Sequence, residues 1–253
     1  MLAVTVFGTS DPWLAGMPNF SQASCSPCSV APTNSPVPAG VAVSGGQVYT
    51  FTASGSVNHG GGSSGPDGRP GVLYTHLESS APQNGIANIN VQINALLGVF
   101  LDDSQPNTTT VPPALNFSSA ASMDFLSLSP ALQQPFFIGN GLTSSSAIQQ
   151  FVAPAGATRL FLGAMDAYGY SNNSGTFSVE VVNPNDAPTG ANKTLTTEED
   201  STLEFTAADF GFNDPLDTPS NNFNRVKITT LPAAGTLKLG VVALSAGGFV
   251  TKA

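Results

Sequence analysis

Charged residues are scarce in this sequence of 253 residues, and basic ones are the scarcest. Only 9% of the residues are charged, and 7 Lys plus Arg stand against 16 Asp plus Glu, which gives a formal net charge of −9. A chain without a basic face cannot neutralise a phosphate backbone. Nucleic acid and anionic membrane surfaces are therefore not expected as partners. Acidic, Asn-rich loops poor in lysine instead suit a protein that offers oxygen ligands to calcium.

Long apolar runs are absent, and cysteines are few. No run of 18 or more apolar residues occurs, and the first residues lack a basic region followed by a long apolar core. We expect no membrane insertion in this segment and a chain that is either mature or a fragment. The two cysteines, Cys25 and Cys28, lie in a Ser/Pro-rich stretch and are too few for a four-thiolate zinc site. A local disulfide, free thiols, and redox or metal chemistry remain open for this pair.

Signatures of catalysis are missing as well. The chain has two histidines, His59 and His76, and neither lies in a recognisable nucleophile context. No zinc-protease, P-loop or dinucleotide-binding motif occurs. The adjacent pair Asp102 and Asp103 is typical of a strand cap or turn rather than of the two carboxylates of a glycosidase. We therefore expect a protein that is not an enzyme.

Turn residues and alternating apolar residues are abundant. The chain has 26 Gly, 20 Pro and 16 Phe, with 41% hydrophobic residues, which is enough to build cores. Alternation of apolar and polar residues, bounded by Gly, Pro, Asn or Ser, predicts strands over 4–8, 46–57, 89–102, 149–154, 158–166 and 175–182. One short helical turn is predicted at 129–132 or at 94–97. The pattern indicates an all-β protein.

A Pro/Asn/Asp cluster, NPNDAPT at 183–189, follows a strongly alternating strand and has the composition of an interdomain joint. It predicts domains over 1–183 and 184–253. In the second, the segments TLEF, VKITTL and TLKL predict short strands. This part is short for a complete sandwich of about 100 residues, so we expect it to be truncated or completed by a neighbour.

The most informative run is DAYGYSNNSGTF at 166–177, which connects two predicted strands. It brings together a carboxylate, Asp166, and two adjacent carboxamides, Asn172 and Asn173. Calcium takes six to eight oxygen ligands from carboxylates, amides and backbone carbonyls, and a glycine-bearing loop lets them converge. By itself, this composition also fits an ordinary turn.

The run SNNSGTFSVEV, preceded by VAPAGATRLFLGAMD, resembles the C-terminal half of the galactophilic calcium lectins of the bacterial PA-IL type. The segments ASGSVNHG at 53–60 and GPDG at 65–68 extend the likeness. The resemblance implies that Asp166, Asn172 and Asn173 hold Ca²⁺ with the main-chain oxygen of His59. The loop is one residue shorter than in the lectins, so the remaining carbonyl is that of Tyr170 or Gly169, and Tyr170 is preferred.

In that family the vicinal hydroxyls of a sugar fill open positions on the ion, so the expected partner is a galactose-like or other cis-diol glycan. The residues expected to contact the sugar are His76, Pro82, Asn84, Asp67 and Tyr168. Trp13 has the apolar face needed to stack on a sugar, but core burial is the preferred role.

Residues 3–183 also resemble the lectin-like domains of bacterial exported proteins, through TSDPWLAGMP at 9–18, INALLGVFLDD at 93–103 and FFIGNGL at 136–142. That likeness implies a secreted or cell-surface location. Residues 187–253 resemble bacterial cadherin-like tandem repeats, through NDAP, TTEEDSTLEF, DFGFNDP and VKITTLPAAGTLKL. The implied calcium ligands of this second part are Glu199, Asp200, Asp214 and Asp217; the same residues are typical of solvated strand edges and turns.

The expected architecture is thus all-β: a lectin-like antiparallel β-sandwich followed by a partial Ig/cadherin-like β-sandwich. The expected function is calcium-dependent carbohydrate binding, as in an adhesin. One alternative is a structural subunit of a bacterial surface filament or biofilm matrix, with calcium-stiffened domains and self-association through strand pairing between neighbours. A weaker one is an accessory module of a secreted hydrolase.

Overall fold

The computed structural model describes residues 2–18, 21, 38–75, 82–167, 169–183, 187–214 and 221–252. The chain forms two compact units, Met1–Pro184 and Asn185–Ala253. It is nearly all β, as predicted: within the described ranges the only α-helix is the single turn α1 (Ala120–Met123). The prediction of a helical turn at 129–132 or at 94–97 was wrong, because neither segment is helical. No helix of the described residues is long and apolar enough to cross a membrane.

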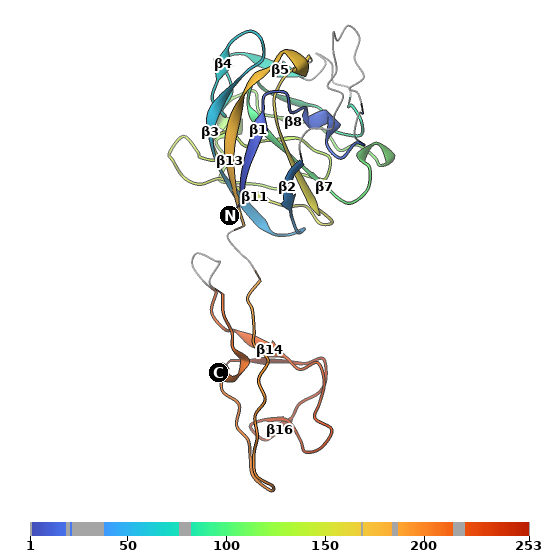
Figure 1. Cartoon of the computed structure of the whole chain (residues 1–253), viewed down its shortest axis with the longest axis vertical. Helices are drawn as coiled ribbons and strands as arrows, with labels where there is room; N and C mark the ends of the chain where they lie inside the picture. The colour runs from blue at the N-terminus through green and yellow to red at the C-terminus, as the bar shows by residue number, and fades with distance from the viewer. Residues whose placement is uncertain are drawn as a thin grey trace. The chain divides into compact units, whose positions relative to one another are not determined.

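The larger sheet of the first unit contains its first and last strands side by side (Figure 1). The order is β1 (Leu2–Phe7), β13 (Ser174–Val182), β3 (Val48–Asn58), β11 (Gln150–Val152) and β9 (Ser127–Leu128), with β4 (Ser63–Ser64) paired to β3. β13 is antiparallel to both of its neighbours. Its buried Phe, Val and Val alternate with exposed residues, as the sequence pattern predicts for a half-buried strand.

The second sheet lies across the core from the first and has the order β10 (Phe136–Phe137), β7 (Leu96–Leu101), β12 (Arg159–Ala164) and β2 (Pro38–Ala42). All six residues of β7 are buried. A strand covered on both faces needs no alternation, which is why the apolar run near 94–97 also suggested a helix. A three-stranded sheet of β5 (Leu73–Thr75), β6 (Ile89–Gln92) and β8 (Leu115–Asn116) completes the unit.

Aromatic side chains fill the space between the two larger sheets. Phe136 of one sheet lies 5.4 Å from Phe151 of the other, measured between ring centroids, and Phe51 packs edge-on against Phe151 at 5.0 Å. Trp13 is 0% exposed in the 3-10 turn η1 (Pro12–Leu14), and its indole N–H donates to the Ala87 carbonyl at 3.0 Å. The preferred core role of Trp13 is confirmed.

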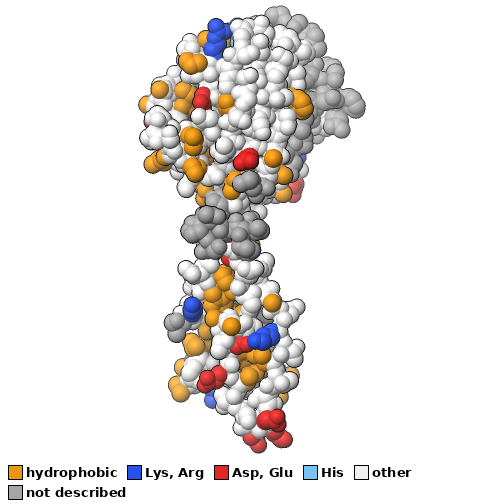
Figure 2. All heavy atoms as spheres, turned by 60° about the vertical axis from the view of Figure 1, so that its left-hand side comes forward, with side chains coloured by type: hydrophobic (Ala, Val, Ile, Leu, Met, Phe, Trp, Pro, Cys, Tyr) orange, Lys and Arg blue, Asp and Glu red, His pale blue; other side chains and the backbone are white. Residues whose placement is uncertain are grey.

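The second unit has far less buried surface. It contains two strand pairs, β14 (Arg225–Lys227) with β17 (Phe249–Thr251) and β15 (Lys238–Leu239) with β16 (Val242–Ala243). The strand expected over TLEF is absent, since residues 202–205 carry no strand pairing. Large apolar side chains are exposed here, and Figure 2 shows apolar groups gathered on this unit: Phe205, Leu231, Leu239, Val241, Val242 and Phe249.

Candidate functional site

The loop between β12 and β13 carries the predicted ligands at its two ends. Asp166 lies two residues after the end of β12, and Asn173 directly precedes β13. Between them, Gly169 adopts the left-handed conformation (φ 82°) that caps the 3-10 turn η4 (Tyr170–Asn172). The loop therefore doubles back and brings its polar ends to the same edge of the sandwich.

Tyr170 anchors this loop from inside the protein. Its side chain is 1% exposed, and its hydroxyl accepts from the Asp166 N–H at 3.0 Å and donates to the Asp166 carbonyl at 3.1 Å. Burial raises the pKa of the Tyr170 hydroxyl well above its usual value, and the nearby carboxyls of Asp11 and Asp166 act in the same direction. The phenol thus stays protonated and able to donate. The Tyr170 carbonyl accepts from the Asn173 N–H at 3.2 Å, and that of Gly169 accepts from the Asn172 N–H at 3.1 Å.

Asp166 and Asn173 are buried, whereas Asn172 is exposed. One carboxylate oxygen of Asp166 accepts from the Ala167 N–H at 2.7 Å. The Asn173 amide donates to the Gly8 carbonyl at 3.0 Å, and its Oδ1 is buried with no hydrogen-bond partner. A buried amide oxygen without a donor is costly by about 1 to 3 kcal/mol, so this oxygen is a candidate for binding a cation.

The end of β3 lies beside the same loop. Asn58 pairs with Ser174 across the two strands, so His59 leaves β3 where Asn173 enters β13. The Asn172 amide packs close to Gly60: a Cβ added there would lie 3.3 Å from Asn172 Nδ2. The His59 ring lies 3.2 Å from Asn94 through Nδ1. The predicted main-chain role of His59 is therefore compatible with the engagement of its ring elsewhere.

Two of the side chains expected to contact a sugar, those of Asn84 and Asp67, form hydrogen bonds within the protein. Pro82 is exposed; the half-buried Asn84 donates its amide to the Trp13 carbonyl at 3.0 Å. Asp67 is exposed and accepts from the Asn140 N–H at 2.8 Å. His76 and Tyr168 lie outside the described residues, as do Cys25 and Cys28.

Sequence analysis missed one buried carboxylate near this loop, Asp11. It is 1% exposed; its Oδ1 accepts from the Trp13 N–H at 2.9 Å, and its Oδ2 is buried without a hydrogen-bond partner. The pKa of Asp11 is raised to about 7, chiefly by burial; the Trp13 N–H opposes this shift, and the nearby charge of Asp166 adds to it. The only local signal was an acid inside the apolar segment DPWL, which is equally typical of a helix cap.

Three of the four acids predicted as ligands in the second unit lie within the described residues. Glu199 and Asp200 are exposed, and Asp200 has a positive φ of 60°. Asp214 is buried and accepts from the Asn221 N–H at 2.6 Å, while Asp217 lies outside the described residues. Across the described parts of both units, no group of three or more His, Cys, Asp or Glu side chains could hold a metal ion. A metal site formed by the described residues alone would therefore include amide or backbone oxygens.

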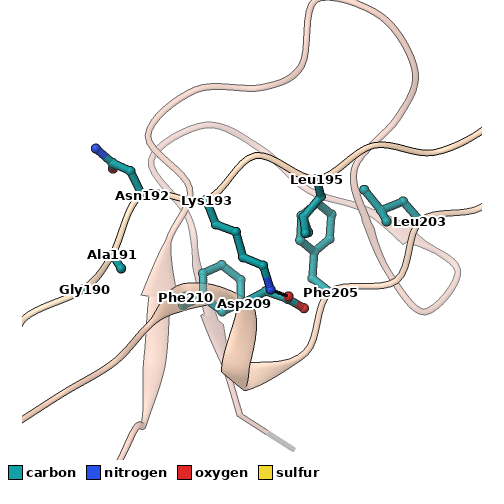
Figure 3. A pocket seen from close by; sticks show the side chains of 9 residues that line it. All are labelled: Gly190, Ala191, Asn192, Lys193, Leu195, Leu203, Phe205, Asp209 and Phe210. Carbon is teal, nitrogen blue, oxygen red and sulfur yellow. Dashed lines mark hydrogen bonds and ion pairs between the residues drawn. The ribbon is translucent and has the colours of Figure 1, made fainter.

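The second unit instead has an open groove of about 550 Å³ (Figure 3). Its lining includes the apolar Leu195, Leu203 and Phe205 beside an ion pair between Lys193 and Asp209. The Lys193 ammonium, with the N–H and hydroxyl of Thr206, lowers the pKa of Asp209 to about 2. The groove is amphipathic and shallow, without a cluster of convergent polar groups.

A solved structure titled "EclA N-terminal domain; PllA-like lectin" is similar to this chain, with 17% sequence identity, 72% of this chain and 94% of that chain covered, and a TM-score of 0.30. None of the protein-family models matches the chain. No curated protein matches it significantly either.

Replacing Tyr170 by Phe tests the anchor of the loop. The change leaves the N–H and the carbonyl of Asp166 without the hydroxyl contact, so we expect about 1 to 3 kcal/mol lower free energy of unfolding, measured by urea denaturation in EDTA. Tyr49→Phe is the matched control: Tyr49 is also buried, and its hydroxyl accepts from the Ser44 N–H at 2.9 Å, away from the loop. If Tyr170→Phe unfolds at the same urea concentration as the unchanged protein, the anchoring role is contradicted.

Proposed function

We propose that the first unit binds carbohydrate through a calcium ion held by the 166–173 loop and the end of β3, in a protein of the bacterial cell exterior. The observation that supports the proposal most is the buried Asn173 Oδ1, which has no hydrogen-bond partner and lies where this loop meets the end of β3. The buried Asp166 and Asn173 lie at the two ends of one loop, and Asn172 packs beside the turn that follows His59.

The donor set fits a hard cation. It consists of a carboxylate, two amides and main-chain carbonyls, which are the ligand types that calcium prefers. Asn173 Oδ1 is buried and accepts no hydrogen bond, so a bound ion would interact with an oxygen that the protein leaves unsatisfied. The free oxygen distinguishes this loop from an ordinary turn, in which such amides hydrogen-bond to their own backbone.

The exposure of the ligands favours contact with an external molecule. Asn172 is exposed while Asp166 and Asn173 are buried, so the site is closed toward the core and open to solvent on one side. A bound calcium would supply positions for two vicinal hydroxyls of a sugar. Asn172, at the open side, can hydrogen-bond to the same sugar.

A glycan array read in saturating calcium and again in EDTA tests this function. We expect binding to glycans with a terminal cis-diol, its loss in EDTA and its recovery when calcium is restored. Glycans without a cis-diol are the matched controls. Calorimetric titration of the full chain with calcium separates the two parts of the proposal. If calcium binds but no glycan on the array does, the proposal of carbohydrate binding is wrong. If calcium does not bind, the 166–173 loop is an ordinary turn without a metal site.

The exposed apolar residues of the second unit favour a second candidate, a structural subunit that associates with its neighbours. Phe249, on β17, and Val242, on β16, are 56% and 64% exposed, and uncovered apolar faces of this kind mark interaction sites. Sedimentation of the full chain over a range of concentrations tests this candidate. Self-association is expected if it is correct, and a monomer at every concentration would exclude pairing between copies.

A further inference from the structure

A second buried carboxylate lies next to the proposed calcium loop. Asp11 follows β1 and begins the 3-10 turn η1. Its neighbour Ser10 accepts from the Ala164 N–H at 3.2 Å, at the end of β12, and a Cβ added to Gly163 would lie 2.7 Å from a Pro12 side-chain atom. The segment that carries Asp11 is thus packed on the last residues of β12, and Asp166 lies two residues after the end of that strand.

The first unit holds very little positive charge to balance these two acids. Residues 1–184 contain no lysine and only two arginines, Arg69 and Arg159. The Arg69 guanidinium donates to the Gly61 carbonyl, and that of Arg159 donates to the carbonyls of Asp102 and Ser104. Neither contributes to the electrostatic environment of Asp11, where the neighbouring charge is that of Asp166.

A buried carboxylate beside another carboxylate disfavours the folded state, since Asp11 loses its hydration while its neighbouring charge, that of Asp166, has the same sign. The two segments in contact also carry buried oxygens without hydrogen-bond donors, Asp11 Oδ2 and Asn173 Oδ1. Asn173 ties the segments together through its hydrogen bond to the Gly8 carbonyl, three residues before Asp11. Oxygen atoms and negative charge are therefore brought to the region where these segments meet, and a divalent cation would compensate both.

We propose that Asp11 is a second acidic group of the cation site, so that calcium is held by the charges of both Asp11 and Asp166. This inference rests on the proposed function, and it adds a residue from the N-terminal segment that the lectin resemblance does not include. Asp11 acts on the affinity for the ion, while Asn172 stays the residue nearest to an incoming sugar.

The test compares Asp11→Asn with Asp166→Asn in the full chain, with Asp103→Asn as the control. Asp103 is exposed and accepts from the Thr158 hydroxyl at 2.7 Å, so its change removes one charge from the same unit without altering a buried group. Calcium affinity is measured by calorimetry, and melting temperature is measured in EDTA. We expect Asp11→Asn to weaken calcium binding by about tenfold or more and to raise the melting temperature in EDTA. Asp103→Asn should change neither.

The outcomes separate this inference from the function on which it rests. If Asp166→Asn loses calcium while Asp11→Asn binds it as the unchanged protein does, Asp11 only caps η1 and the inference is wrong, although the calcium site stands. If the unchanged protein binds no calcium, the proposed function itself fails. Asp11→Ser, which keeps an oxygen acceptor for the Trp13 N–H, replaces Asp11→Asn if that variant does not fold, and the same loss of affinity is expected.

Discussion

Replacing Asp166 by asparagine is expected to raise the dissociation constant for calcium by at least about 100-fold, which corresponds to about 2.7 kcal/mol. The change keeps the shape of the side chain and removes its charge, so the proposed site loses the carboxylate of the 166–173 loop. Stability in EDTA should be unchanged or higher, because a buried charge is gone. Calorimetric titration measures the affinity, and thermal melting in EDTA measures the stability.

The exposed Asp124 provides a second control for this variant. Asp124 accepts from the N–H and hydroxyl of Ser144 and lies on the surface of the same unit. Asp124→Asn should leave the calcium affinity within about twofold of the unchanged protein, since an exposed charge is screened by solvent. If Asp166→Asn behaves like Asp124→Asn, calcium binds elsewhere or not at all.

Replacing Trp13 by alanine should lower the free energy of unfolding by about 3 to 5 kcal/mol. The indole is fully buried, and its removal leaves a large cavity as well as an Ala87 carbonyl without its 3.0 Å donor. Urea denaturation followed by circular dichroism measures the loss. Leu126→Ala is the control, because Leu126 is 65% exposed and its truncation should cost at most about 0.5 kcal/mol.

A milder variant guards against complete unfolding. Trp13→Phe keeps most of the apolar volume and removes the indole N–H, so it should cost less than Trp13→Ala but still more than about 1 kcal/mol. A loss below 0.5 kcal/mol for Trp13→Phe, on the order of a surface change, would contradict the described packing. Trp13 is the only tryptophan of the chain, so its fluorescence in the unchanged protein reports the unfolding of the first unit directly.

Strands in which apolar and polar residues alternate clearly were predictable from sequence. Short strands that exist only through pairing with a neighbouring strand were not. β13 begins at Ser174 and the prediction began at 175, because FSVEV alternates strictly and its apolar face is buried. The predicted strand 89–102 is two strands, β6 and β7, separated by a turn in which Asn94 has a positive φ of 64°. Strands of two residues such as β9 have too few positions to show a period, and only pairing in the folded protein defines them.

The candidate site was likewise predictable only where its residues are close together in the sequence. Asp166, Asn172 and Asn173 are neighbours in sequence, so a motif could suggest them. Asp11 is far from them along the chain, and only the packing of the β1–η1 turn against β12 reveals it. The strand expected at 202–205 followed the pattern of TLEF, but a strand needs a hydrogen-bonding neighbour, and Leu203 and Phe205 instead line the groove of the second unit.

The pairing of β1 with β13 determines when the site can form during synthesis. Leu2 pairs with Val181, and Asn173 binds the Gly8 carbonyl across 165 residues of sequence. These contacts cannot form before β13 has been synthesised, so the proposed site stays incomplete until the last strand of the unit has left the ribosome. An ion that binds only the closed pocket stabilises the finished domain and not its precursors. Calcium is therefore expected to slow the unfolding of the first unit far more than it speeds its folding.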